Sequence, residues 1–144
     1  MPVMFGRYWL ARAGGRAADC GMQPDERLDA WGACHELSVL VYRVTAGWPA
    51  AEVYGLASQA RRAAFLAALY SADDLPVPDV ERRRFRIERA VTALDHLRYA
   101  LLLAHELGYL SVDDRETVGR LAHRAEELVR ARLALITGPP RLVK

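Results

Sequence analysis

The chain has 144 residues, a length that suits one domain with a substantial buried core. Apolar residues make up 52% of it, which excludes a disordered chain, and no apolar run approaches the roughly 18 residues that span a bilayer. The 20 basic and 18 acidic residues give a net charge of +2, too small to indicate a nucleic-acid partner by itself. We therefore expect a soluble, single-domain protein without a membrane partner.

The two ends of the chain are predicted to lie outside the folded domain. Residues 1–24 are expected to form a flexible N-terminal tail, residues 25–138 the domain, and residues 139–144 a C-terminal tail. The first stretch carries Arg7, Arg12 and Arg16 but lacks the continuous apolar segment of a signal peptide, so the predicted location is the cytoplasm. Cys20 and Cys34 form no C-x-x-C motif, and Cys34 is expected to be a small buried hydrophobe.

The first predicted helix lies between Asp25 and Trp48. Its apolar residues recur at alternating steps of four and three, the spacing of a buried helix stripe: Ala30, Cys34, Leu37, Val41, Val44 and Trp48. Gly47 and Pro49 bracket its end, and Pro49 suits the first position of a following helix after a tight turn.

The second predicted helix runs from about Ala50 to Tyr70. Its core stripe is mostly alanine, which allows a neighbouring helix to approach closely: Val53, Leu56, Ala60, Ala63, Ala67 and Tyr70. The linker over residues 71–78 holds two prolines and two acidic residues, so the helix is expected to end there.

The third and fourth predicted helices are long. Asp79 suits the N-cap of the third, which is expected to continue to Leu107 and to end at Gly108. Its core stripe is Ile87, Ala90, Leu94, Leu97, Leu101 and Ala104. Ser111 and Asp114 resemble a capping box for the fourth helix, which Gly138 ends. Its inner face is Val118, Leu121, Ala125, Leu128 and Val129.

Four amphipathic helices, two pairs of them joined by short connections, predict an all-α fold. The expected architecture is an antiparallel up-down-up-down four-helix bundle.

Catalytic and metal-binding patterns are not found in the sequence. The paired Glu-x-x-His motifs of carboxylate-bridged metal bundles are missing, and His35-Glu36 and His105-Glu106 begin an H-E-x-x-H pattern whose second histidine is replaced by Val39 or Tyr109. No glycine-rich phosphate loop or G-x-S-x-G motif occurs. We expect no metal, no cofactor and no enzymatic activity.

Basic residues gather at the start of the third helix. The candidate nucleic-acid-binding residues are Arg82, Arg83, Arg84, Arg86 and Arg89, with Arg61 and Arg62 from the second helix. Arg82, Arg86, Arg89 and His96 fall on one stripe, which suits a phosphate backbone. Positive charge at a helix N-terminus also opposes the helix dipole. The alternative is an ordinary solvated face with helix pairs such as Arg84 with Glu88 and Asp95 with Arg98.

The later part of the third helix carries more apolar surface than its core stripe needs. Tyr99, Leu102 and Leu103 lie beside that stripe, so a subunit interface is predicted to bury them. By contrast, Glu116 with Arg120 and Glu126 with Arg130 are favourable i,i+4 pairs, which indicates a structural role for the fourth helix.

Residues 52–64, E-V-Y-G-L-A-S-Q-A-R-R-A-A, closely resemble the bacterial four-helix-bundle family called 23S ribosomal RNA intervening-sequence proteins. Trp31, residues 42–45, Pro49 and residues 107–110 also fall where that family's pattern has them, so the resemblance covers roughly residues 30–136. Its structural motif residues here are Glu52, Tyr54, Gly55, Gln59 and Arg62.

The resemblance implies a small bundle that assembles as a ring, typically a homopentamer. It also implies a relation to accessory proteins of diversity-generating retroelements, which bind RNA and a reverse transcriptase. One departure is that the family's Asn-Ile-Ala-Glu-Gly turn is replaced here by residues 69–73, L-Y-S-A-D. An inter-helix polar network would account for Glu52, Gln59 and Arg62 without a ligand.

Two functional hypotheses follow. In the first, a homo-oligomeric bundle binds structured RNA or a ribonucleoprotein through the seven arginines. In the second, the oligomer is a scaffold for protein partners with no nucleic-acid role.

Overall fold

The computed structural model describes residues 26–72 and 79–138, and within these ranges the chain is helical without any strand. The elements are α2 (Glu26–Thr45), a 3₁₀ turn η1 (Ala50–Glu52), α3 (Leu56–Ser71), α4 (Val80–Glu106) and α5 (Val112–Thr137). The all-α prediction is confirmed for this part of the chain. Both predicted tails and most of the linker over residues 71–78 lie outside the described residues. No helix in the described ranges combines the length and apolar character needed to cross a membrane.

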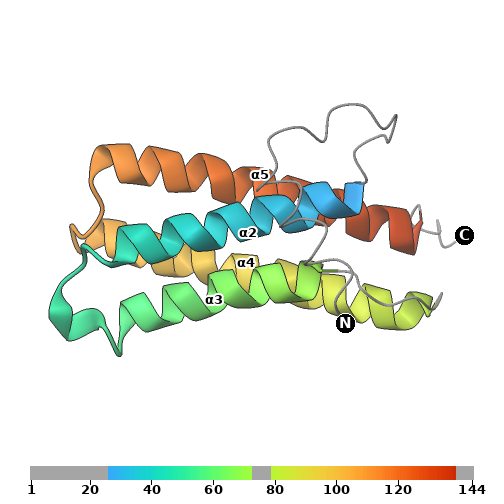
Figure 1. The fold of residues 1–144 in the computed structure, drawn as a ribbon, viewed down its shortest axis with the longest axis horizontal. Helices are drawn as coiled ribbons and strands as arrows, with labels where there is room; N and C mark the ends of the chain where they lie inside the picture. Colours follow the sequence, from blue (N-terminus) through green and yellow to red (C-terminus); the bar gives the residue numbers. More distant parts are fainter. Residues whose placement is uncertain (1–25, 73–78, 139–144) are drawn as a thin grey trace, which may run out of the picture.

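The four helices lie side by side with their long axes roughly aligned (Figure 1). Helix α3 packs against α2 and α4, and α5 packs against the same two helices, so each helix has two large contacts. The α2–α3 and α4–α5 connections lie at the same end of the molecule, on the left of the view (Figure 1). These contacts are compatible with a four-helix bundle around one core.

The core is built largely from the predicted stripes, and the side chains that α3 contributes to it are small. Six predicted core residues are only partly buried: Val44, Leu56, Tyr70, Leu101, Leu121 and Leu128. Helix α3 buries five alanines, and α4 buries four more beside Ile87, Leu94 and Leu97. Alanine at the contact lets two helix backbones approach closely, so α3 and α4 can pack tightly over most of the length of α3. The buried alanines of the two helices are Ala57, Ala60, Ala63, Ala64, Ala67, Ala90, Ala93, Ala100 and Ala104.

The predicted ends of the two long helices are confirmed. The Asp79 side chain accepts a hydrogen bond from the backbone N–H of Arg82 at 3.2 Å, and Ser111 Oγ accepts one from the N–H of Asp114 at 3.1 Å. Gly108 and Gly138 have φ of 75° and 69°, in the left-handed region that glycine adopts without strain. Local sequence therefore determines where α4 and α5 begin and end.

The predicted start of the second helix is wrong. The α-helix begins at Leu56 rather than at about Ala50, and Pro49 precedes the short η1 turn instead of opening the helix. Val53, expected in the core, is 48% exposed. The physical reason is a local cap: Glu52 Oε2 accepts the N–H of Leu56 at 2.8 Å, which favours helix initiation after Gly55.

Candidate functional site

Two arginines at the start of α4 flank an exposed aromatic ring. Phe85 is 55% exposed, and Arg82 and Arg89 stand three residues before it and four after it, so all three share one face of the helix. The Arg89 guanidinium carbon lies 4.8 Å from the centre of the Phe85 ring and 5.8 Å from that of Tyr70. The Arg82 side chain makes no hydrogen bond or ion pair with any described residue. We call Arg82, Phe85 and Arg89 the arginine–phenylalanine surface.

Arg86, by contrast, holds α3 and α4 together. Its Nη2 donates to the carbonyl oxygens of Leu69 at 3.0 Å and of Ala72 at 3.3 Å, and its guanidinium lies 5.7 Å from the centre of the Tyr70 ring. The last carbonyls of a helix have no partner within the helix, so a cation placed there satisfies them and suits the helix dipole. This contact gives Arg86 a structural role that the sequence reasoning missed.

The other arginines of the α4 cluster differ in their surroundings. Arg84 Nε donates to Glu88 Oε1 at 2.9 Å, as the solvated-face alternative predicted, and that hydrogen bond raises the pKa of Arg84. Arg83 is partly buried rather than exposed. The five arginines predicted as one nucleic-acid-binding cluster therefore do not form one uniform basic face.

The two arginines of α3 diverge. Arg61 turns toward α2, where its Nε donates to Thr45 Oγ1 at 2.8 Å and its guanidinium lies 5.1 Å from the Tyr42 ring centre. Arg62 points in a different direction and lines a groove between α3 and α4. Adjacent helix residues are about 100° apart, so neighbouring arginines cannot share one contact. Only Arg62 is therefore on the same side as α4.

The groove between α3 and α4 has a volume of about 680 Å³ and is largely apolar. Leu56 and Leu66 of α3 face Tyr99 and Leu103 of α4 across it, and Tyr99 is 66% exposed. Gln59, Arg62, Asp95 and His96 supply its polar lining, while alanines from both helices complete it. Two of the three residues predicted for a subunit interface thus line one groove.

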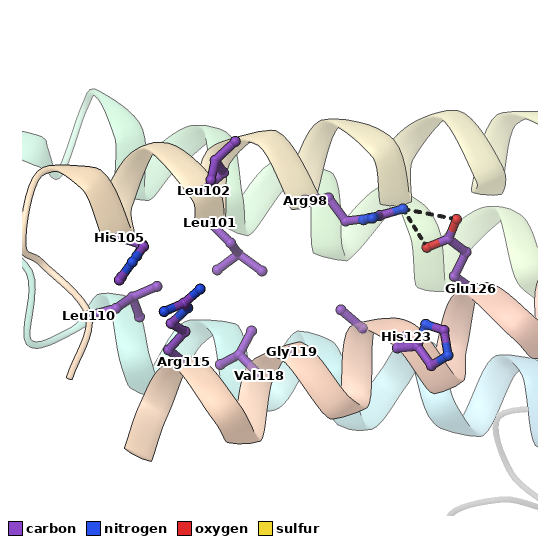
Figure 2. Close-up of a pocket in the computed structure, with 11 residues that line it drawn as sticks. Arg98, Leu101, Leu102, His105, Leu110, Arg115, Val118, Gly119, His123 and Glu126 are labelled. Carbon is purple, nitrogen blue, oxygen red and sulfur yellow. Dashed lines mark hydrogen bonds and ion pairs between the residues drawn. The ribbon is translucent and has the colours of Figure 1, made fainter. Parts of the chain in front are cut away.

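The third predicted interface residue, Leu102, lies elsewhere. It is 54% exposed and lines a different groove, between α4 and α5, together with Leu101 (Figure 2). Leu102 and Leu103 are separated by about 100° around the helix axis, which explains why they border opposite neighbours. The three residues therefore form a band across the outer face of α4 rather than one pocket.

The family-like motif has a structural explanation at two of its five residues. Glu52 caps α3, and its Oε1 also accepts the Tyr109 hydroxyl at 3.2 Å, which joins the start of α3 to the connection between α4 and α5. A Cβ at Gly55 would lie 2.5 Å from Glu52 Oε2, so the cap leaves no room for a side chain there. Tyr54 is 96% exposed, and neither Gln59 nor Arg62 joins the predicted polar network among the described residues.

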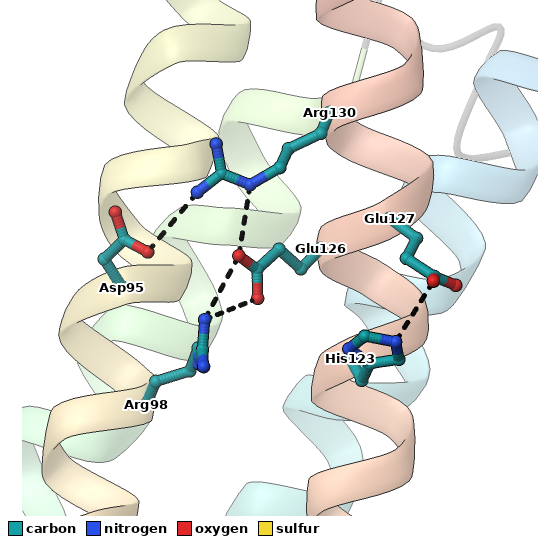
Figure 3. A network of polar contacts seen from close by, with 6 residues as sticks. All are labelled: Asp95, Arg98, His123, Glu126, Glu127 and Arg130. Atoms are coloured by element: carbon teal, nitrogen blue, oxygen red, sulfur yellow. Dashed lines mark hydrogen bonds and ion pairs between the residues drawn. The ribbon is translucent and has the colours of Figure 1, made fainter.

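A polar network joins α4 and α5 on the surface, and sequence spacing predicted only part of it. Arg130 Nε donates to Glu126 Oε1 at 3.1 Å, as the i,i+4 pattern predicted (Figure 3). Arg98 does not pair with Asp95; it donates across the helices to both Glu126 oxygens at 3.0 and 3.2 Å. Asp95 lies 3.8 Å from Arg130 instead. The Glu126 side chain is only 13% exposed, so two arginines compensate a partly desolvated carboxylate.

A buried polar cluster lies in the core near the end of α3. Cys34 and Ser71 are fully buried, Arg132 is 6% exposed, and Arg132 Nη1 donates to the Ser71 carbonyl at 2.7 Å. Burial raises the pKa of the Cys34 thiol to about 11, opposed by a hydrogen bond with Ser71 and the charge of Arg132. Cys34 is thus buried in the core, as expected from the sequence.

No group of three or more His, Cys, Asp or Glu side chains in residues 26–72 and 79–138 is placed to hold a metal ion. His123 Nε2 lies 3.0 Å from Glu127 Oε1 on the surface of α5 (Figure 3).

No family model matches this chain, and no curated protein matches it significantly.

Proposed function

We propose that this chain is a non-enzymatic, cytoplasmic protein that forms a homo-oligomer and binds structured RNA or a ribonucleoprotein. Its four helices are proposed to form an antiparallel up-down-up-down bundle. The ring of helix contacts supports this topology, as does the position of the α2–α3 and α4–α5 connections at one end of the molecule (Figure 1).

The observation that carries the RNA proposal is the arginine–phenylalanine surface on α4. Arg82 and Arg89 lie about one helical turn before and one turn after the exposed Phe85, and the Arg89 guanidinium stacks on the Phe85 ring at 4.8 Å. RNA-binding proteins commonly stack unpaired bases on aromatic rings and arginine planes while cations contact the phosphates. A structured RNA with an unpaired loop would provide both features.

The test is the binding of a fluorescent RNA hairpin with an unpaired loop to the intact protein, measured by anisotropy from 50 to 200 mM salt. The double variant Arg82→Gln, Arg89→Gln is expected to weaken binding at low salt. It should also reduce the slope of log K against log salt by about 1–2, because two phosphate contacts are lost. Phe85→Ala should weaken binding of the hairpin by about tenfold and leave a fully paired duplex less affected.

The matched control is Arg120→Gln, Arg124→Gln, which removes the same charge from exposed positions on α5. Equal losses in the two double variants would mean that only net charge matters and would refute a specific surface. Hairpin binding that is independent of salt and of all these substitutions would refute the RNA proposal.

Self-association is proposed to use the α3–α4 groove, supported by the exposure of Tyr99 and the apolar lining around Leu103. Burial of such side chains provides most of the free energy of subunit association. The intact protein is expected to sediment as an oligomer, with five subunits if the family resemblance holds. Tyr99→Ser, Leu103→Ser should lower the mass in solution, whereas the control Leu135→Ser, at a 69% exposed position on α5, should not. A monomeric wild-type protein would overturn this part of the proposal.

The protein-scaffold alternative is favoured by one observation, the size and apolar character of the same groove. It predicts capture of a protein partner that survives nuclease treatment and high salt and that Tyr99→Ser abolishes. Retention of RNA by the wild-type protein, with loss on replacing Arg82 and Arg89, would decide in favour of RNA.

Membership of the 23S ribosomal RNA intervening-sequence family is part of the proposal. It is supported by the motif over residues 52–64, in which Glu52 and Gly55 build the cap that starts α3.

A further inference from the structure

The groove between α4 and α5 differs in chemistry from the one between α3 and α4. It has a volume of about 350 Å³ and combines an apolar floor with basic side chains. Leu101 and His105 extend from α4 toward Val118 and Arg115 of α5 across the same hollow, and Leu110 lies beside them (Figure 2). This volume is at the lower end of the roughly 300–1,000 Å³ typical of small-molecule sites.

Gly119 keeps the middle of this groove open. It lies within α5, where glycine destabilises a helix relative to alanine, so a glycine there calls for a physical reason. Neither usual reason applies: its φ is not in the left-handed region, and a Cβ built on it would meet no atom within 4 Å. The consequence of the missing side chain is therefore open space beside Val118 and Ala122.

The charge at the groove is positive at one end. At the other end, Glu126, the one acidic residue of the lining, is already compensated by Arg98 and Arg130. The side chain of Arg115, exposed in the first turns of α5, makes no hydrogen bond or ion pair with any described residue, and neither does the imidazole of His105 opposite it. A guanidinium facing an imidazole beside an apolar floor complements a carboxylate joined to a short hydrocarbon.

We propose that the α4–α5 groove binds a small amphipathic carboxylate. The carboxylate contacts Arg115 and His105, and the hydrocarbon lies over Leu101, Val118 and the space left by Gly119. This site is separate from the arginine–phenylalanine surface and from the α3–α4 groove, so the inference does not depend on the proposed RNA function.

The test uses hexanoate as the probe, titrated into the intact protein while amide NMR signals are followed. The Gly119 and Arg115 signals should shift along one saturating curve. Acetate, which lacks the hydrocarbon, and 1-hexanol, which lacks the charge, should each bind at least about tenfold more weakly. Equal binding of all three probes, or no saturable shift with hexanoate, would overturn the proposal.

Two variants and two controls separate the parts of the site. Gly119→Leu fills the groove from a position with free space around it and should abolish hexanoate binding without unfolding α5; Arg115→Gln should weaken it about tenfold. Ala131→Leu and Arg120→Gln introduce the same side chains at exposed positions of α5 outside the groove, and both variants should bind hexanoate as the wild type does. Unchanged binding by Gly119→Leu would overturn the site. A wild type that does not bind hexanoate, combined with an altered solution mass of Gly119→Leu, would show instead that the groove is a subunit contact.

Discussion

Substitution of Glu52 is expected to lower stability more than is usual for a half-buried surface residue. Its carboxylate joins the η1 turn to the start of α3 and to the connection between α4 and α5. Its Oε2 accepts the N–H of Leu56, and its Oε1 accepts the hydroxyl of Tyr109, whose ring lies 6.1 Å from that of the buried Trp48. Glu52→Ala removes both acceptors at once. Leu56 then loses its cap, and Tyr109 loses the contact that holds the α4–α5 connection against the start of α3.

The magnitude follows from the two hydrogen bonds. Loss of an N-terminal cap costs about 1 kcal/mol, and loss of a hydrogen bond to a charged group costs roughly 1.5 kcal/mol when the site is partly exposed. Glu52→Ala should therefore lower the free energy of unfolding by about 2–3 kcal/mol, or roughly 6–10 °C in Tm. Glu52→Gln keeps one acceptor and the shape of the side chain, so about half of that loss is expected.

The assay is urea unfolding followed by circular dichroism, extended to a double-mutant cycle. Tyr109→Phe removes only the hydroxyl, and the cycle with Glu52→Ala should give a coupling free energy of about 1 kcal/mol. Glu106→Ala is the matched control, since the exposed side chain of Glu106 makes no hydrogen bond or ion pair with any described residue and its loss should change stability by less than about 0.5 kcal/mol. The reasoning is refuted if Glu52→Ala is as mild as the control, or if its effect adds fully to that of Tyr109→Phe.

Three further substitutions test other contacts by urea unfolding. Gly55→Ala should lower the free energy of unfolding by about 1–2 kcal/mol, because the new Cβ would lie 2.5 Å from the Glu52 carboxylate and displace it. In a Glu52→Ala background the same substitution should have little further effect, and full additivity would contradict this. Arg86→Gln should cost about 1–2 kcal/mol by freeing the carbonyls of Leu69 and Ala72, and an unchanged midpoint would show that those contacts contribute nothing. Burial raises the pKa of Cys34 from 9.0 to about 11, so the unfolded chain loses this proton first as pH rises. Stability should fall by roughly 3 kcal/mol between pH 9 and 11, less steeply in Cys34→Ala; equal slopes would refute this.

The sequence predicted those features that depend on local chemistry and on helical periodicity. The stripes around Leu37 and Leu97, and the ends of helices at Asp79, Gly108 and Ser111, follow from residues close in sequence, and all are found in the structure. The start of α3 was predicted wrongly because periodicity continues through residues 50–55. The helix starts later because of a side chain: Glu52 accepts the N–H of Leu56, four positions downstream, and so caps the helix there.

The candidate site was less predictable because it depends on which helix each side chain faces. Sequence grouped Arg61 with Arg62, yet one contacts Thr45 of α2 and the other lines the α3–α4 groove. It also grouped Arg86 with Arg82, although Arg86 binds the carbonyls that end α3. Spacing along one helix gives the angle between two side chains around the helix axis. It does not give the neighbouring helix that each side chain contacts, which depends on how the helices pack.

The alanine-rich core has a thermodynamic consequence. Both phenylalanines of the described residues, Phe65 and Phe85, are 55% exposed, and Tyr99 is 66% exposed, while α3 buries only alanines and one serine. The heat capacity of unfolding depends on how much apolar surface becomes hydrated, so a single subunit should have a smaller value than the roughly 12–15 cal/mol/K per residue of ordinary domains. If association covers the aromatic rings, much of the missing heat capacity should appear in the assembly step as a negative change. Calorimetry of dilution would measure this heat-capacity change. A large value would mean that apolar side chains are buried between subunits as much as within each subunit.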